Sequence, residues 1–487
     1  MNILNHKKTK NAEVQASEEV IGLKSFIGVA STIAMPIIIQ NLIHTLVGTA
    51  DTIMLGYVSQ EAMAASSLAN QILTVLWMTL NGLITGGCVM VAQYWGKKDY
   101  HTIERVMGLA VRFSMIISII FFAVVFFFPE MVMSMFIKDP DVIAEGIRYL
   151  KIVGFSYLFM GFSQVYMSIQ RSIERVILPS VTSTVSLVIN VFINAVFIFG
   201  LFGLPKLGLV GVAIGTVTAR FVEFIICAIH AICHTTATFR IKYVFAKSGI
   251  LMKDFLKLSF PSLINDVAWS LAFSTYSVIL GRLGSDAVAA NAVALVVLDI
   301  GAIVSRGFSN ATTIIVGKEL GQSKIHTAKV YARRMVWITV VCCIFGGAII
   351  IGLRPLIISI YADKLSATAI KYLGAMLLMQ SYHLMGEGLN TCWICGCFRG
   401  GGDAKFGMIV DTIMMWGVAV PVMAIAAFVL KLPVEWVYFA MCLDEFEKML
   451  PTYIHYKKFN WLKNITRDEA ELAVQNKFSK PYYKNIM

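Results

Sequence analysis

The sequence predicts an all-α integral membrane protein of twelve transmembrane helices, arranged as two parallel six-helix repeats. Composition is the first observation behind this prediction. Of the 487 residues, 57% are hydrophobic and 14% are charged, whereas a soluble domain carries about 25% charged residues. One globular core cannot hide so large an apolar excess, because a protein surface in water needs polar cover. The other two observations are a series of long apolar segments and an internal repeat.

Twelve segments of the chain are apolar over the length of about 20 residues that a helix needs to cross the hydrocarbon layer. Several are longer than one crossing requires, so we expect them to tilt or to protrude into water. The segments lie near residues 25–56, 62–94, 104–130, 144–169, 176–201, 207–233, 252–281, 287–317, 327–352, 366–397, 404–430 and 434–456.

The connections between these segments alternate in charge, and this alternation predicts their orientation. Every second connection is rich in lysine and arginine, including the one with Arg399 and Lys405, as are both ends of the chain, whereas the intervening connections carry mainly single cations. Cytoplasmic loops carry such an excess of basic residues. We therefore expect a multi-pass protein of the cell (plasma or inner) membrane with both termini in the cytoplasm. Basic loops also explain the net charge of +12 without nucleic-acid binding.

An internal repeat relates the two halves of the chain. A shift of 225 residues aligns proline, glycine and loop residues without a gap: Pro36 with Pro261, Gly56 with Gly281, Gly82 with Gly307, and Gly96 with Gly321. A shift of six helices preserves orientation, so the halves are parallel repeats. Transporters built in this way place the substrate between two lobes and rock one lobe against the other.

The repeat divides the chain into five expected parts. These are a cytoplasmic N-terminal segment (1–24), an N-terminal six-helix lobe (25–233), a cytoplasmic linker (234–251), a C-terminal six-helix lobe (252–456) and a basic cytoplasmic tail (457–487).

Ionisable and amide side chains inside the predicted spans are the candidate functional residues, because such groups are costly in lipid and are usually functional. The predicted cation-coupling set is Asp51, Asn190, Asn194 and Thr216. A carboxylate together with amide and hydroxyl oxygens suits a proton or a sodium ion. The alternative is that the amides and hydroxyls only join helices by hydrogen bonds.

A second set of residues is predicted to bind substrate: Gln40, Gln71, Asp266, Trp269, Asp299 and Asp411. For Asp299 a structural ion pair with Arg306 is an open alternative. Asp444 shares its helix with Glu445 and Lys448, and we interpret that group as a solvated helix end.

Two patterns that suggest cofactor chemistry are incomplete. Cys392, Cys395 and Cys397 lack a fourth ligand at a useful spacing, so we predict no metal site. The Gly400–Gly402 run is followed by no Walker lysine, so we interpret it as a turn. Along the sequence, the eight histidines show no grouping with a nucleophile or an acid. We therefore predict that the protein is not an enzyme and uses no cofactor beyond a coupling ion.

In their order along a duplicated chain, several short motifs resemble those of the multidrug and toxic compound extrusion (MATE) transporters. The resemblance extends from about Pro36 to Lys463. The motifs are Gln40-Asn41, residues 51–56, 69–71 and 93–96, the segment from Asn190 to Gly200, and residues 317–321 and 399–403. The resemblance implies a V-shaped pair of six-helix lobes that exports organic, often cationic compounds in exchange for H⁺ or Na⁺.

The resemblance also carries over individual positions. In many members an acid of the first helix carries the coupling, which corresponds to Asp51, and a threonine of the sixth helix corresponds to Thr216. The fifth-helix pair is often Asn followed by Asp, whereas this chain has Asn190 and Asn194. Some members have a glutamate where this chain has Trp269, so that cation site is not carried over.

The mechanism that we expect is neutralisation of Asp51 by H⁺ or Na⁺, which releases a bound lipophilic cation. The expected partners are small organic substrates, the coupling ion and the bilayer, and the protein is expected to be a monomer. The alternative is a lipid-linked oligosaccharide flippase of the same superfamily, which would line its cavity with several cations. Only Arg112, Arg220 and Arg306 lie near the middle of predicted spans, and this disfavours the flippase. Parallel duplication disfavours a channel or a receptor.

Overall fold

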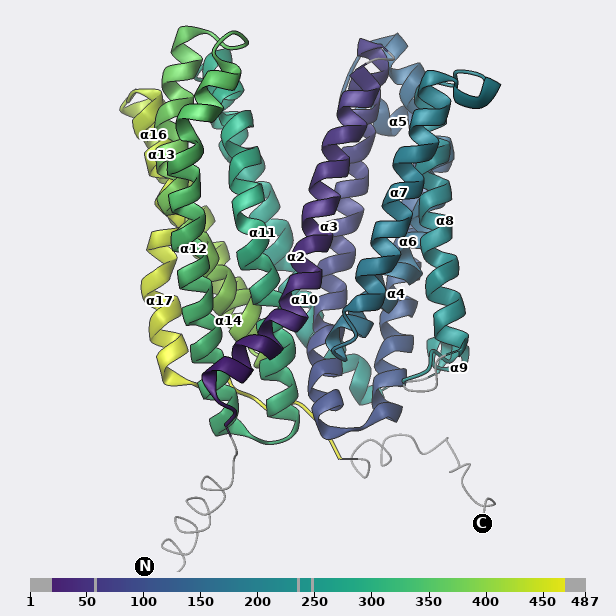
Figure 1. Ribbon diagram of the computed structural model, residues 1–487, viewed down its shortest axis with the longest axis vertical. Coiled ribbons are helices and arrows are strands. Elements are labelled where there is room, and N and C mark those ends of the chain that lie inside the picture. Colours follow the sequence, from purple (N-terminus) through teal and green to yellow (C-terminus); the bar gives the residue numbers. More distant parts are fainter. Residues whose placement is uncertain (1–19, 57–58, 234–236, 247–248, 469–487) are drawn as a thin grey trace, which may run out of the picture. The chain divides into compact units, whose positions relative to one another are not determined.

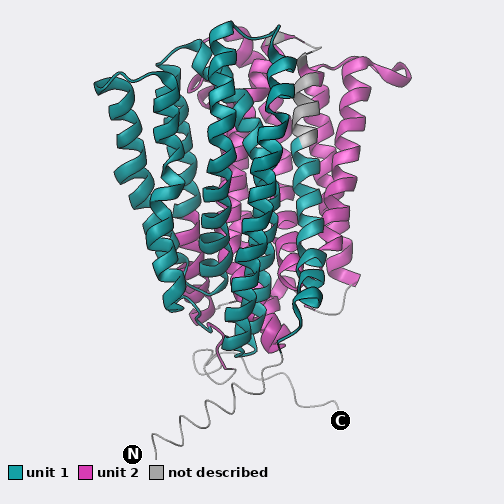
Figure 2. Ribbon diagram, turned by 60° about the vertical axis from the view of Figure 1, so that its left-hand side comes forward, with its two compact units in different colours: residues 1–45, 264–464 teal, residues 46–263, 465–487 magenta. Residues whose placement is uncertain are grey.

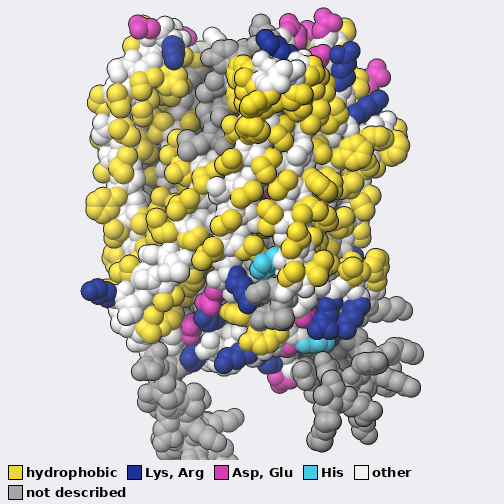
Figure 3. Space-filling model, turned by 45° about the vertical axis from the view of Figure 1, so that its right-hand side comes forward, with side chains coloured by type: hydrophobic (Ala, Val, Ile, Leu, Met, Phe, Trp, Pro, Cys, Tyr) yellow, Lys and Arg dark blue, Asp and Glu magenta, His cyan; other side chains and the backbone are white. Residues whose placement is uncertain are grey.

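The computed structural model describes residues 20–56, 59–233, 237–246 and 249–468, and the side chains of all these residues except 46–53, 56 and 60. The described chain consists of helices joined by short connections (Figure 1). Long helices are the form expected in lipid, because each helix satisfies its own backbone hydrogen bonds. On the face shown in Figure 3, hydrophobic side chains cover the middle and most charged side chains gather towards the two ends.

The described residues of the first half of the chain form seven α-helices and a 3₁₀ turn. They are α2 (Leu23–Gly56), α3 (Gln60–Lys97), α4 (Tyr100–Phe127), α5 (Pro129–Ser134), α6 (Pro140–Ser172), α7 (Ile177–Phe199), η1 (Leu201–Gly203) and α8 (Leu209–Cys233). Polar side chains cap several helix starts, as expected for free backbone N–H groups. Ser59 accepts from the amide of Ala62, and Asp99 accepts from that of Thr102.

The second half begins with the short helix α9 (Ile241–Phe245). It continues with α10 (Gly249–Gly281), α11 (Ser285–Gly321), α12 (Ile325–Tyr361), α13 (Ala367–Thr391), η2 (Cys392–Phe398), α14 (Ala404–Met414), η3 (Met415–Ala419), α15 (Val420–Ala424), η4 (Ile425–Val429), α16 (Val434–Cys442) and α17 (Asp444–Lys458). The elements η2, η3 and η4 are π-helical turns within longer helices.

Ten helices of the described chain are long and apolar enough to cross a membrane. The two remaining predicted spans, 366–397 and 434–456, correspond to α13 with η2 and to α16 with α17. Both contain buried polar side chains, and Leu443 interrupts the last span between its two helices. The polar residues lower the hydropathy of α13, whereas α16 and α17, with 9 and 15 residues, are each too short to cross a membrane alone.

The structure divides into two compact units, and two of the three limits between them lie inside helices, α2 and α10 (Figure 2). Unit 1 comprises Met1–Thr45 and Ile264–Asn464, and unit 2 comprises Leu46–Leu263 and Ile465–Met487. The sequence instead predicts lobes that meet at the linker 234–251. The units therefore differ from the predicted lobes by an exchange of the first parts of α2 and α10, each of which contains a proline.

Glycine contacts explain this exchange. In unit 1, a Cβ atom added at Gly307 of α11 would overlap Ile38 of α2, and in unit 2 a Cβ atom added at Gly82 of α3 would overlap Leu263 of α10. The sequence repeat relates these two contacts: a shift of 225 residues places Ile38 on Leu263 and Gly82 on Gly307. In unit 2 the hydroxyl of Ser259 also donates to the carbonyl of Leu83 at 2.7 Å. The two halves of the chain thus use equivalent glycines to accept the start of the other half's first helix.

We expect Gly82→Val and Gly307→Val each to lower the free energy of unfolding by about 1–3 kcal/mol, because an overpacked contact forces helices apart. Gly352→Val in α12 is the matched control, since a Cβ atom at Gly352 meets nothing within 4 Å. Denaturant titration of the purified variants in detergent measures the difference. Equal stability of Gly307→Val and Gly352→Val would show that the close helix contact is not required.

The short helix α9 lies against the start of α4 in unit 2. Arg112 of α4 donates to the carbonyl oxygens of Val244 and, at 2.6 Å, of Ala246. Arg240 also pairs with Glu104 of α4 at 3.0 Å. Part of the predicted linker, residues 234–236 and 247–248, lies outside the described residues.

The described end of the predicted tail also belongs to unit 2. The guanidinium of Arg467 pairs with Asp254 of α10 at 2.6 and 3.0 Å, and the amide of Ile465 donates to Gln93 of α3 at 2.8 Å. Asp468 pairs with Lys97 at 2.8 Å. These contacts hold residues 465–468 against the adjacent ends of α3 and α10.

Candidate functional site

Three of the four predicted cation-coupling residues meet in unit 2. Asn190 and Asn194 lie on one face of α7, where the Asn194 amide donates to the Asn190 carbonyl oxygen at 3.4 Å. The Asn190 amide donates to the hydroxyl of Thr216 in α8, also at 3.4 Å. All atoms of Asn194 are buried, and the absence of a side chain at Gly215 leaves room for its carboxamide. The structure thus forms a buried amide and hydroxyl cluster between α7 and α8.

The fourth predicted coupling residue, Asp51, belongs to α2, but its side chain lies outside the described part of the structure. Its relation to the amide cluster therefore stays a prediction. Gln71 is exposed on α3, and Gln40 is buried on the part of α2 that belongs to unit 1. These two predicted substrate residues thus occupy different units.

A row of buried and half-buried charges runs through unit 1 from α10 to α17. It starts at Asp266, which pairs with Arg399 at 2.7 Å. The same guanidinium donates to the side-chain oxygen of Asn265 at 2.8 Å, and the Asn265 amide donates to Asp411 at 2.7 Å. Asn265 therefore links a buried cation to a buried anion, and it connects α10 with α14.

The row continues from Asp411 into α17. The ammonium of Lys448 lies 3.5 Å from Asp411 and 2.8 Å from Glu445. The second oxygen of Glu445 accepts from the amide of Asn390 in α13 at 2.8 Å. The side chain of Lys448 is only 1% exposed, so its charge is balanced by protein carboxylates and not by water.

A histidine extends the row towards the start of α17. The ring of His383 in α13 lies 3.2 Å from Asp444, whose other oxygen accepts from the hydroxyl of Tyr276 at 3.4 Å. We call Asn265 and the charged or titratable groups of this row the charge network. Its ionisable members are Asp266, His383, Arg399, Asp411, Asp444, Glu445 and Lys448.

The structure corrects two interpretations from sequence. Asp444, Glu445 and Lys448 do not form a solvated helix end, because all three are at most 3% exposed. The break at Leu443 makes Asp444 and Glu445 the first residues of α17, and that turn packs on α13 in the middle of the last predicted span. Arg399, assigned from sequence to a basic connection, is 8% exposed and ion-paired.

The remaining predicted residues of the second half lie apart from the charge network. Arg306 pairs with Asp299 at 3.2 Å and with Glu387 at 3.0 Å. The ion pair between Asp299 and Arg306 was the alternative interpretation of Asp299, and the structure confirms it. The side chain of Asp299 is 60% exposed. The ring of Trp269 contacts that of Phe273, with centroids 4.1 Å apart and ring planes tilted by 33°.

The charge network holds more negative than positive charge. Its four carboxylates face two permanent cations, Arg399 and Lys448, and His383 adds a third positive charge only when it is protonated. Unbalanced charge is costly in a buried site. Uptake of one or two protons, or of one monovalent cation, brings the network closer to neutrality.

Ligand atoms of His383, Asp444 and Glu445 lie within 4.8 Å of one another, a spacing that a metal ion could use. The ammonium of Lys448 already lies against Glu445, however. We therefore interpret these residues as part of the ion-pair network and keep the prediction that no metal is bound.

Comparison with known proteins identifies relatives of the whole chain. The family model described as MatE matches residues 36–196 and 261–425. The uncharacterized transporter YisQ of Bacillus subtilis is 24% identical over 445 residues, covering 89% of this chain and 94% of the relative. A probable multidrug resistance protein NorM of Thermotoga maritima is 23% identical over 452 residues, covering 90% of this chain and 94% of the relative.

Solved structures share the fold. One describes an outward-facing conformation of a multidrug resistance MATE family transporter of the MOP superfamily, with a TM-score of 0.82, 18% identity and coverage of 92% of this chain and 100% of that one. A second is a MOP superfamily transporter from Pyrococcus furiosus whose binding pocket is reported to have reverse polarity, with a TM-score of 0.82, 18% identity and coverage of 91% and 99%. These likenesses confirm the predicted all-α membrane fold of twelve spans in two lobes.

Proposed function

This chain belongs to the MatE family of transporters, and from that premise we propose that it exports organic, often cationic compounds in exchange for H⁺ or Na⁺. The family match covers both halves of the chain, and several relatives carry the name multidrug resistance protein. On this proposal it is a multi-pass protein of the cell membrane with both termini in the cytoplasm, and it works as a monomer.

The observation that carries the coupling part of the proposal is the charge network of unit 1. Ionisable groups within a membrane span are rare and usually mark an ion or proton pathway. Here Asp411 is held by Asn265 at 2.7 Å and by Lys448 at 3.5 Å. An incoming cation that neutralises Asp411 removes the attraction of Lys448 for that carboxylate, and Glu445 remains as the near partner of Lys448. The contact between α14 and α17 therefore depends on the bound ion.

Such a dependence is what an exchanger needs. A coupling ion can shift a conformational equilibrium only by its differential affinity for the two states. The network joins α10, α13, α14 and α17, so occupancy by an ion alters contacts among four helices at once. We propose that Asp51, with Asn190, Asn194 and Thr216, provides the corresponding site of the first half, and that Gln40, Gln71, Trp269 and Asp299 contact the substrate.

A lipid-linked oligosaccharide flippase is the second candidate, and the arginines argue against it. Arg112 binds the carbonyl groups at the end of α9, Arg220 pairs with Glu223 at 2.9 Å, and Arg306 pairs with two carboxylates. Pyrophosphate would need several cations that are not already neutralised. The three arginines that sequence pointed to are engaged within the protein.

We expect ethidium efflux from cells that express the protein to fail in the Asp51→Asn variant. Asparagine carries no charge, so binding of an ion can no longer switch this side chain between a charged and a neutral state. Collapsing the sodium gradient and the pH gradient separately identifies the coupling ion. Equal efflux by wild type and variant would place coupling elsewhere, with the charge network as the next site. No efflux from either would leave the family and fold in place and would argue against ethidium as a substrate.

A further inference from the structure

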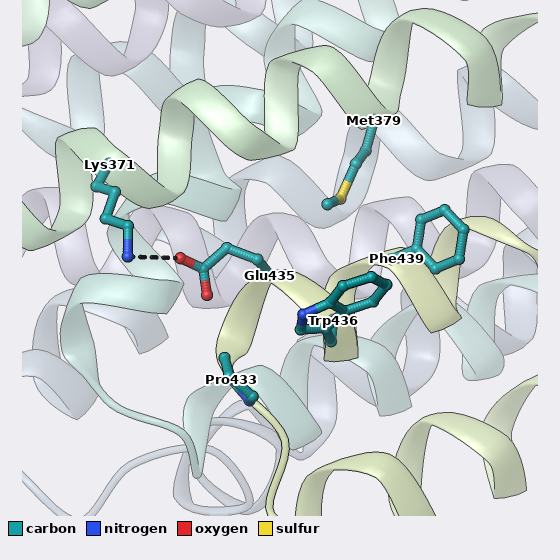
Figure 4. A pocket seen from close by; sticks show the side chains of 6 residues that line it. All are labelled: Lys371, Met379, Pro433, Glu435, Trp436 and Phe439. Carbon is teal, nitrogen blue, oxygen red and sulfur yellow. Dashed lines mark ion pairs between the residues drawn. The ribbon is translucent and has the colours of Figure 1, made fainter.

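A pocket opens between α13 and α16 in unit 1, away from the charge network. Its volume is about 600 Å³, and its lining combines an ion pair with apolar side chains: Lys371, Met379, Pro433, Glu435, Trp436 and Phe439. Figure 4 shows Lys371 and Glu435 facing each other across one end of the pocket, with Met379 and Phe439 at the other end.

The ionic end offers one group of each sign. The ammonium of Lys371 lies 3.2 Å from a carboxylate oxygen of Glu435, and the lysine side chain is 76% exposed whereas that of Glu435 is 21% exposed. An ammonium carries three donors, and one carboxylate oxygen does not use them all. The ion pair can therefore accept a ligand that brings its own positive and negative charge.

The apolar end continues along both helices. Met379 is two turns after Lys371 on α13, which corresponds to about 12 Å along the helix. Trp436 is 60% exposed and follows Glu435 directly at the start of α16. Charge alternation predicts that the starts of α13 and α16 lie at the outer surface of the membrane. Tryptophan is enriched at such interfaces, where its ring meets both lipid and water.

We propose that this pocket binds a zwitterionic aminophospholipid of the bilayer. Lys371 contacts the phosphate, Glu435 contacts the primary ammonium, and an acyl chain lies along Trp436, Phe439 and Met379. A phosphatidylglycerol headgroup would satisfy Lys371 but would leave Glu435 beside a second anion. A choline headgroup has no N–H donor for the carboxylate. Charge complementarity therefore favours phosphatidylethanolamine over both.

Native mass spectrometry of the purified full-length protein tests this. The protein is titrated in detergent with phosphatidylethanolamine, phosphatidylglycerol or phosphatidylcholine of identical acyl chains, and the lipid-bound fraction is measured. We expect wild type to retain phosphatidylethanolamine best. Lys371→Gln and Glu435→Gln should each weaken that retention about threefold, the value of one partly exposed ionic contact. Trp436→Ala should weaken retention of all three lipids.

Arg148→Gln provides the matched control. Arg148 pairs with Glu145 at 3.2 Å on α6 and is also mostly exposed, but it lines no part of this pocket, so its variant should bind like wild type. The proposal is overturned if the three lipids are retained equally, or if Lys371→Gln and Glu435→Gln match Arg148→Gln. Melting curves of all variants separate loss of the lipid contact from loss of the fold.

Discussion

Replacing Lys448 with methionine should lower the free energy of unfolding by about 3–5 kcal/mol, the usual cost of removing one partner from a buried ion pair. Lys448 is 1% exposed and lies between Asp411 at 3.5 Å and Glu445 at 2.8 Å. Methionine fills much of the same volume, so the loss reports mainly the uncompensated carboxylates and not a cavity. Denaturant titration of the purified variant in detergent measures the change.

A second variant separates charge from packing. Lys448→Met combined with Glu445→Gln removes one charge of each sign, so the network keeps the net charge of the wild type. We expect the double variant to recover more than half of the lost stability. Arg148→Met, which breaks the exposed pair with Glu145, should cost less than about 1 kcal/mol. A change in Lys448→Met no larger than in Arg148→Met would show that the buried pair does not stabilise the fold.

The number of membrane spans and their helical form could be predicted because membrane crossing imposes a length and a composition on each segment. The repeat also predicted which glycines of the two halves occupy equivalent positions. Gly82 and Gly307 align at the 225-residue shift, and in the structure they form equivalent contacts with Leu263 and Ile38. What the repeat could not show is that each glycine contacts the first helix of the other half. Periodicity identifies the face of a helix but not its partner.

The charge network illustrates the same limit. Asp266 and Asp411 were selected because acids in apolar segments are costly, and the structure joins them through Asn265 and Arg399. Lys448 was missed, since a lysine among glutamates near a basic tail resembles a solvated helix end. The available signal was its position: it lies inside the predicted span 434–456, which is needed to complete an even number of crossings.

Asp411→Asn should abolish the response of export to the ion gradient while leaving the protein folded, because asparagine has the shape of aspartate but cannot be neutralised by an ion. Its carboxamide oxygen can still accept the hydrogen bond from Asn265, and Lys448 retains Glu445 at 2.8 Å. The variant thus resembles the ion-loaded state permanently. We expect gradient-driven ethidium transport in proteoliposomes to fall at least about tenfold, which corresponds to about 1.4 kcal/mol. Ethidium binding should persist but no longer change with pH or sodium.

Glu145→Gln is the matched control for this experiment, since Glu145 also pairs with an arginine, Arg148 at 3.2 Å, but is 34% exposed and stands outside both the charge network and the proposed substrate residues. Its variant should change gradient-driven transport less than about twofold, as expected for an exposed pair. If Asp411→Asn instead keeps the full wild-type response and Asp51→Asn loses it, coupling belongs to the first half of the chain alone. The charge network would then be a structural device that holds α10, α14 and α17 together, and the excess of carboxylates over cations would need no ion to balance it during transport.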